Sequence, residues 1–74
     1  MIRVKLIPRI KVKLAEHNMK QIELADKLGL NKQTISNICN GKTLPSIDKL
    51  FSMAYIFNCS TDDLYKYEVI EEPE

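Results

Sequence analysis

Apolar residues recur at two different spacings along this chain of 74 residues. Between residues 10 and 64 they return every three or four positions, which is the spacing of helices that bury one side. Near both ends they alternate with polar residues, which is typical of strands. The helical blocks are separated by Gly, Asn and Pro residues, which interrupt helices. The pattern predicts five short helices between two terminal strands.

Two of these helices lie close together within residues 21–38. Their apolar stripes consist of Leu24, Ala25 and Leu28 in the first helix and Ile35, Ile38 and Cys39 in the second. Gly29 between them can take a positive φ, and Asn31 can cap the second helix. Because the turn is short, the two helices must cross, with the small Ala25 where they come closest. This is the geometry of a helix-turn-helix, whose second helix can enter a DNA major groove.

The boundaries of the other helices follow from single residues. Pro8 is predicted to begin the first helix, because the first turn of a helix does not need its missing N–H, and Asn18 to end that helix. Ser46 is predicted to cap the fourth helix and Asn58 to end it. A capping-box pattern from Ser60 predicts the start of a short fifth helix.

The terminal stretches 1–6 and 65–70 alternate apolar and polar residues in the manner of half-buried strands. The two strands can pair as a small sheet that joins the termini, with Arg3 or Lys5 opposite Glu68. The pattern leaves open whether they pair within one chain or between two chains. The predicted fold is therefore all-α, a five-helix domain over residues 1–74 with its core in 9–65 and, as an option, this two-stranded sheet. The acidic end, 71–74, is expected to fray.

Cysteine and histidine content argues against a metal site or a disulfide framework. Cys39 and Cys59 lie 20 positions apart, outside any C-x-x-C pair, and His17 is the only histidine. Buried, reduced thiols in the cytoplasm are the simpler interpretation. No stretch approaches the roughly 18 apolar residues of a membrane span, and the N-terminus lacks the features of a signal peptide.

Charge is distributed unevenly, although the net charge is only +1. Residues 1–49 hold ten of the eleven Lys and Arg residues and four acids, whereas residues 50–74 hold one Lys and six acids. A basic first part and an acidic end suit a protein that meets a polyanion with one face. Chance clustering of ordinary surface charge is the alternative.

The residue series resembles the Cro/repressor (Xre) type helix-turn-helix proteins, which share the lambda-repressor fold. The resemblance covers about residues 9–65 and rests on Gln21, Ala25, Gly29, Ile35, Ile38, Asn40, Gly41, Lys42, Pro45 and residues 60–64. It implies a five-helix bundle that binds a double-stranded DNA operator, commonly as a homodimer, and regulates transcription. The terminal stretches look most like those of short, single-domain members.

One departure from that family concerns a buried ion pair. Many members carry an Arg in the first helix and a Glu at the end of the third, where this chain has Leu14 and Cys39. Because both charges are replaced together, neither partner is left unpaired, and such exchanges can be neutral or stabilising. The departure bears on the subfamily and leaves the fold intact.

Residues expected to contact DNA lie on and around the helix at 31–39. The expected base contacts are Lys32, Gln33, Ser36 and Asn37, and the expected backbone contacts are Gln21, Asn31, Thr34, Lys42, Thr43 and, more remotely, Lys13. Amide side chains can form paired bonds with adenine, and lysine can donate to guanine. A polar, solvated helix face is the ordinary alternative, but this face carries no acid. No catalytic residue, cofactor site, metal site or small-molecule substrate is predicted, so the chain is not expected to be an enzyme.

Three functions fit these observations. The first is a sequence-specific transcriptional regulator, most simply a repressor that reads the major groove; the others are an antitoxin that also masks a toxin, and a protein-interaction module that keeps the fold without reading DNA. A homodimer would place two recognition helices about 34 Å apart. Its interface is expected either at Tyr65, Tyr67, Val69 and Ile70 or on the Phe51 and Tyr55 side of the fourth helix. Completion of the monomer core is the alternative role for both groups.

Overall fold

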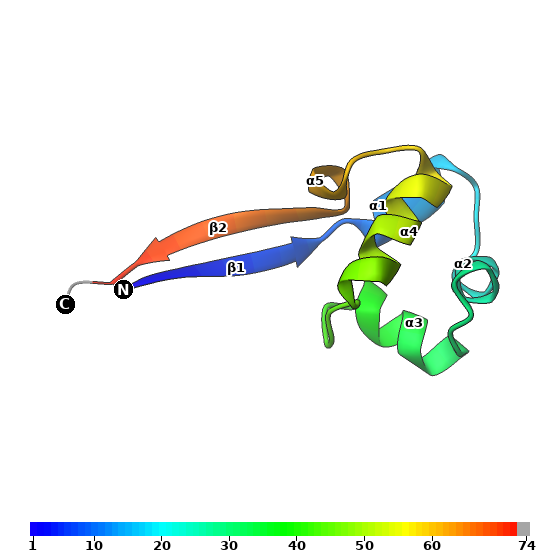
Figure 1. Cartoon of the computed structure of the whole chain (residues 1–74), viewed down its shortest axis with the longest axis horizontal. Coiled ribbons are helices and arrows are strands. Elements are labelled where there is room, and N and C mark those ends of the chain that lie inside the picture. The colour runs from blue at the N-terminus through cyan, green and yellow to red at the C-terminus, as the bar shows by residue number, and fades with distance from the viewer. Residues whose placement is uncertain (73–74) are drawn as a thin grey trace.

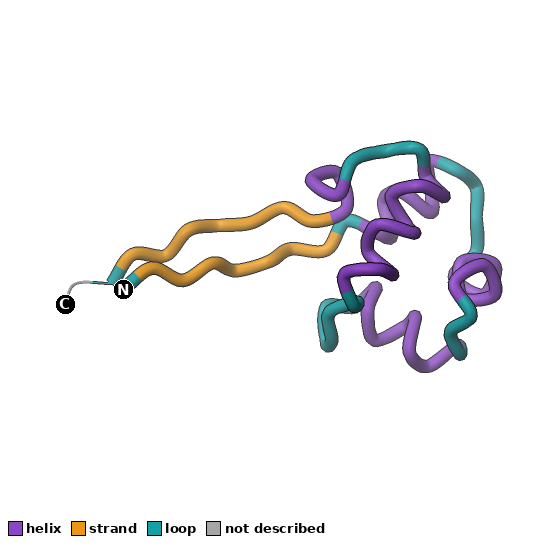
Figure 2. Tube along the Cα trace, viewed as in Figure 1, coloured by secondary structure: helices purple, strands orange, loops and turns teal. Residues whose placement is uncertain are grey.

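The computed structural model describes residues 1–72 and combines a helical part with a long two-stranded arm (Figure 1). The elements in chain order are β1 (Ile2–Pro8), α1 (Ile10–Glu16), α2 (Gln21–Leu28), α3 (Lys32–Cys39), α4 (Ile47–Phe57), α5 (Thr61–Leu64) and β2 (Tyr65–Glu71). The arm makes the molecule elongated, with principal extents of 45, 23 and 20 Å. The five predicted helices are therefore confirmed. The fold is not all-α, because the two strands form the two-stranded sheet that was predicted as an option (Figure 2).

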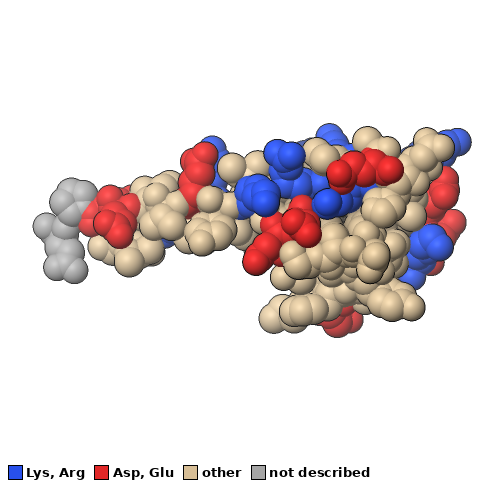
Figure 3. Space-filling model, turned by 90° about the horizontal axis from the view of Figure 1, so that it is seen from above, with Lys and Arg blue, Asp and Glu red and all other residues tan. Residues whose placement is uncertain are grey.

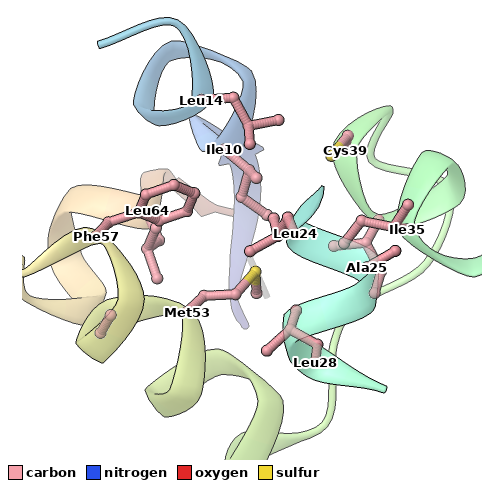
Figure 4. Close-up of a cluster of buried hydrophobic side chains, with 12 residues drawn as sticks. Ile10, Leu14, Leu24, Ala25, Leu28, Ile35, Cys39, Met53, Phe57 and Leu64 are labelled. Atoms are coloured by element: carbon pink, nitrogen blue, oxygen red, sulfur yellow. The ribbon is translucent and has the colours of Figure 1, made fainter. Parts of the chain in front are cut away.

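The core lies between the five helices and contains only apolar side chains (Figure 4). Its buried members are Ile10, Leu14, Leu24, Ala25, Leu28, Ile35, Ile38, Cys39, Met53, Ala54, Phe57 and Leu64. Each of the five helices contributes at least one of them, so each helix is held by the face that its sequence period predicts. Within residues 1–72 no polar or charged residue is classed as buried.

The first four helices end in the same backbone motif. The residues with a left-handed conformation after these helices are Asn18 (φ 52°), Gly29 (69°), Gly41 (79°) and Asn58 (53°). The next residue in each case donates its N–H to the carbonyl five positions earlier, at 2.9 Å: Met19 to Leu14, Leu30 to Ala25, Lys42 to Asn37 and Cys59 to Ala54. Such bonds satisfy carbonyls that a helix end would leave free, and they turn the chain sharply. The chain therefore turns after four of its helices by the same local motif.

Two predicted helix starts are wrong in detail. Pro8 does not begin α1; it is the last residue of β1, opposite Tyr65, and α1 begins at Ile10. Ser46 does occupy the position before α4, but its hydroxyl donates to Asp48 Oδ1 at 2.5 Å and does not accept from the helix backbone. The α5 start is closer to expectation, since the Ser60 N–H and hydroxyl both donate to Asp63 Oδ2 at 3.2 Å.

β1 and β2 pair antiparallel within one chain and form a seven-residue ribbon. Both strands extend beyond the predicted ranges 1–6 and 65–70. Lys5 lies opposite Glu68 as predicted, whereas Arg3 lies opposite Ile70 and forms an ion pair with Glu72. Pairing continues into the stretch where fraying is expected, because Glu72 and Met1 exchange backbone hydrogen bonds. Residues 73–74 lie outside the described part of the chain.

Candidate nucleic-acid interface

The turn between α2 and α3 brings these two helices into direct contact. Gly29 ends α2 in the left-handed conformation, with φ of 69°, as its position predicts. Ala25 is 1% exposed and packs in the core with Leu28 of its own helix and Ile35 of α3, as Figure 4 shows. A small side chain at this place allows two helix backbones to approach closely. The crossing predicted for residues 21–38 is therefore confirmed.

α3 begins at a capped end and lies along the edge of the helical part away from α5 (Figure 1). Asn31 Oδ1 accepts a hydrogen bond from the Thr34 backbone N–H at 2.7 Å, which satisfies one of the free donors of the first turn. Ile35, Ile38 and Cys39 face the core. The opposite side of the helix is thereby left for other contacts.

The outward face of α3 carries the four predicted base-contacting residues. Lys32 and Gln33 are exposed, and Ser36 and Asn37 are half-buried. Gln33 Nε2 donates to Asn37 Oδ1 at 3.0 Å, so the two amides are oriented together. This bond leaves the Gln33 carbonyl oxygen and the Asn37 NH₂ free to meet a base edge.

The sequence reasoning missed Asn40 as a member of this face. Asn40 Nδ2 lies 3.4 Å from Ser36 Oγ and is exposed directly after α3. Its position four residues after Ser36 was the available signal, since residues four apart lie on one side of a helix. Asn40 extends the row of uncharged hydrogen-bonding groups by one helical turn.

Lys42 and Thr43 are held at the C-terminal end of α3 by their backbone. Both N–H groups donate to the Asn37 carbonyl, at 2.9 and 3.4 Å. Gly41, which precedes them, lies against the ribbon: a Cβ there would come within 3.4 Å of Pro8 Cγ. The exposed side chains of Lys42 and Thr43 are therefore carried by an anchored turn next to the outer face of α3.

Gln21 is the first residue of α2 and is half-buried. The Glu23 carboxylate accepts the N–H of the preceding Lys20 at 3.5 Å, so one donor of this helix end is already used. The backbone N–H of Gln21 belongs to the first turn of α2, where backbone donors have no partner within the helix. An anion approaching α2 can be bound there.

Lys13 is the one predicted contact that the structure does not bring to this group. Its ammonium lies 3.1 Å from Glu16 of the same helix, and its side chain is only 20% exposed. The hydrogen bond with Glu16 raises the pKa of Lys13, and Asp63 of α5 adds to the effect. In the view of Figure 3, taken from above Figure 1, basic and acidic side chains are intermixed. Lys13 therefore lies beside the acids Glu16 and Asp63 and not among the exposed residues of α3.

The positions that differ from the Arg and Glu of the resembled family are both in the core. Leu14 is 5% exposed and Cys39 is 3% exposed. Burial raises the pKa of the Cys39 thiol, so it stays protonated at neutral pH. Both cysteines are free thiols. Within residues 1–72 there is no cluster of three or more metal-binding side chains, and no helix is long and apolar enough to cross a membrane.

Comparison with known proteins gives three kinds of match. A family profile described as helix-turn-helix matches residues 10–64. An HTH-type transcriptional regulator of Methanocaldococcus jannaschii, itself uncharacterised, is 40% identical over 60 residues, or 81% of this chain and 91% of that protein. A 10 kDa protein of the ImmF control region of Bacillus phage phi105 is 39% identical over 70 residues, or 92% of this chain and 78% of that protein. A crystallised Bacteroides fragilis protein assigned as DNA-binding has a TM-score of 0.78 and 35% identity, covering 84% of this chain and all of that one.

Proposed function

The chain belongs to the helix-turn-helix family of DNA-binding transcriptional regulators, and from this premise we propose that it represses transcription by reading an operator with α3. The observation that carries the proposal is the outer face of α3. That face has no acid, and its Gln33 and Asn37 amides are already oriented by their mutual hydrogen bond. A domain bound to an operator excludes other proteins from the same DNA by its volume, so repression needs no additional activity.

Two groups of contacts have different roles in this proposal. Lys32, Gln33, Ser36 and Asn37 would read base edges in the major groove, where each base pair presents a distinct pattern. Backbone contacts would come from Gln21 at the start of α2, Asn31 and Thr34 at the start of α3, and Lys42 and Thr43 after its end. Contacts to phosphates position a protein on the duplex without specifying sequence.

Because α3 is only eight residues long, one domain offers few base contacts. We propose that the chain binds a two-fold related operator as a homodimer, with recognition helices about one DNA turn, or 34 Å, apart. The proposal includes no catalytic step. It places the protein in the cytoplasm, where the free thiols Cys39 and Cys59 stay reduced.

The first prediction concerns base reading by Gln33. After an operator has been selected from random double-stranded DNA, Gln33→Ala should weaken binding to it by about 1–3 kcal/mol. The loss should be confined to operators that carry the preferred base at one position, because Gln33 would contact that base alone. Binding of wild type and variant to operators changed at single positions, measured by fluorescence anisotropy, tests this. Equal weakening on every DNA sequence would contradict base reading by Gln33.

Lys42→Ala is the matched control for Gln33→Ala, because it removes a side chain beside α3 that would contact only a phosphate. It should weaken binding to all sequences alike, and the dependence of log K on log salt should flatten by about one unit. If selection yields no preferred site over bulk DNA, the repressor proposal is wrong. A role as an interaction module, or as an antitoxin whose partner supplies specificity, would then be favoured.

A further inference from the structure

The ribbon has one apolar face that no other element within residues 1–72 covers. The apolar ribbon face consists of Ile2 (68% exposed), Val4 (54%), Leu6 (42%), Tyr67 (65%) and Val69 (53%). Val4 lies opposite Val69 and Leu6 opposite Tyr67, so these side chains share one side of the ribbon. An isolated two-stranded ribbon is marginally stable in water, and it becomes stable when something packs on its apolar side. The ribbon therefore lacks the cover that its sequence pattern requires.

The other face of the ribbon is suited to water. Lys5 lies opposite Glu68, and Lys66 lies opposite Ile7. Arg3 and Glu72 form an ion pair at the tip. The apolar ribbon face carries one charged residue, Glu71 opposite Ile2 at the tip, whereas the other face carries Arg3, Lys5, Lys66 and Glu68 beside Ile7 and Ile70.

At its base the apolar ribbon face continues into a groove beside the helical part. The groove has a volume of about 250 Å³ and is lined mainly by apolar and aromatic residues of the ribbon and the α4 region, together with Thr61 and Asp62 of α5. In Figure 3 the helical part extends below the arm and its lower side is mostly uncharged, while acidic side chains lie where the arm meets the helical part. The ribbon and the helical part therefore meet at a mainly apolar groove that also contains Asp62.

We propose that a second copy of this chain covers the apolar ribbon face, with the two ribbons packed face to face and antiparallel. The two-fold axis lies between the ribbons, perpendicular to the strands. In this arrangement the tip of each ribbon, with Ile2, reaches the groove at the base of its partner. The homodimer of the proposed function is the premise here, and the inference assigns its interface.

The size of the ribbon supports this overlap. Seven residues span about 23 Å and two strands are about 10 Å wide, so ribbon-on-ribbon contact alone is a narrow strip. A stable interface buries about 800 Å² on each partner. The groove at the base, with exposed Leu44, supplies further apolar surface to the tip of the partner's ribbon. A two-fold interface must also be self-complementary, and the apolar strip of Val4, Leu6, Tyr67 and Val69 meets that condition, with Glu71 beyond it at the tip.

The position of α3 supports the direction of the axis. In Figure 1 β1 and β2 lie one above the other, and α3 lies along the lower edge of the helical part. Rotation about an axis in the ribbon plane, perpendicular to the strands, exchanges the two ends of the arm and keeps the lower side lowermost. Both α3 helices then face the same side of the dimer. Their separation is set by the ribbon length of about 23 Å together with part of each helical body, a distance of the order of one DNA turn, about 34 Å.

α4 carries a second exposed apolar stripe, Ile47, Phe51 and Tyr55. This helix is already held in the core by Met53, Ala54 and Phe57, so it does not depend on a partner. The ribbon has no comparable support. The assignment therefore rests on the ribbon.

The test is the mass of the full-length protein in solution without DNA, measured by sedimentation velocity over a range of concentrations. Wild type should sediment at twice the chain mass of 8.6 kDa. Val69→Glu places a charge on the apolar ribbon face and should reduce the species to a monomer. Ile70→Glu, the matched control, places the same charge on the next residue, on the opposite face beside Arg3, and should leave the dimer intact. Circular dichroism should show unchanged helix content in both variants.

A monomeric wild type at all concentrations would overturn the inference, as would equal behaviour of Val69→Glu and Ile70→Glu. If Val69→Glu fails to fold, Tyr67→Lys serves instead, since Tyr67 is more exposed and lies on the same face. Because the sedimentation measurement contains no DNA, a monomeric wild type would contradict the interface without contradicting base reading by α3. Conversely, a dimer that selects no operator would support the interface and contradict the repressor proposal.

Discussion

Single residues with a left-handed backbone decide where each of the first four helices ends. Two of these positions are occupied by asparagine and two by glycine, with nearly the same φ. Gly29 has no atom within 4 Å of the place where a Cβ would stand, so only backbone strain opposes a side chain there. Gly41 is different, because a Cβ would also approach Pro8. The requirement at Gly29 is therefore purely conformational.

Replacement of Gly29 should follow the backbone preference of the new residue. Gly29→Ala should lower the free energy of unfolding by about 1 kcal/mol, the left-handed strain being partly offset by the lower entropy of the unfolded chain. Gly29→Asn should cost less, because Asn18 and Asn58 adopt the same conformation in this fold. Urea unfolding of the two variants tests the order. Equal losses would show that the side chain and not the backbone matters at this turn.

Individual helices could be predicted where local signals were complete. For α2 and α3 the apolar period, Gly29 and Asn31 all indicate the same boundaries, and the structure agrees. Pro8 was misassigned because its fixed φ suits the first turn of a helix and the end of a strand equally. Only pairing with Tyr65, 57 positions away, decides between them. Asn40 was missed for a related reason, since its contact with Ser36 depends on where α3 ends.

α5 is the shortest helix, and its start depends on one carboxylate. Hydrogen bonds from the Ser60 N–H and then from its hydroxyl hold the pKa of Asp63 below its usual range. A lowered pKa in the folded state stabilises the fold above the pKa of the unfolded chain, and this contribution is lost as the pH falls through the folded-state pKa.

Asp63→Asn should therefore lower the Tm at neutral pH, and the difference from wild type should shrink as the pH falls below about 4. Thermal unfolding followed by circular dichroism measures this between about pH 2 and pH 7, a range that includes the whole titration of an aspartate. Asp62→Asn is the control, because the described hydrogen bonds at Ser60 involve Asp63 only. A constant difference across the pH range would mean that the Asp63 carboxylate does not stabilise α5 through its charge.

At the scale of the whole molecule, the chain combines a self-sufficient helical core with an arm that has little core of its own. The alternating stretches predict the strands. The sequence leaves open whether they pair within one chain or between two, because the alternation of apolar and polar residues and the pairing of opposite charges would be the same in both cases. In the structure the strands pair within one chain. What remains is which face of the ribbon contacts a second copy. Tyr67 and Val69 of the predicted interface group lie on the apolar ribbon face, Ile70 lies on the other, and Tyr65 is half-buried at the base.

If the ribbons of two copies support each other, thermal stability should depend on protein concentration. A partner that binds only the folded state raises the Tm by mass action, and a tenfold increase in concentration should raise it by about 3–5 °C for a chain of this size. Differential scanning fluorimetry at several concentrations tests this. Val69→Glu should show a concentration-independent Tm, and a wild-type Tm that does not shift would contradict a folded dimer.

The register of the ribbon also imposes an order in time. Ile2 pairs with Glu71, so the first strand to leave the ribosome must wait for the last one, while the turns that connect the helices form from neighbouring residues. Contacts between distant residues form late because a long loop must close first. The helical part can therefore fold before the surface for a second copy exists. Folding chains of this protein would be protected from premature assembly until β1 and β2 have paired.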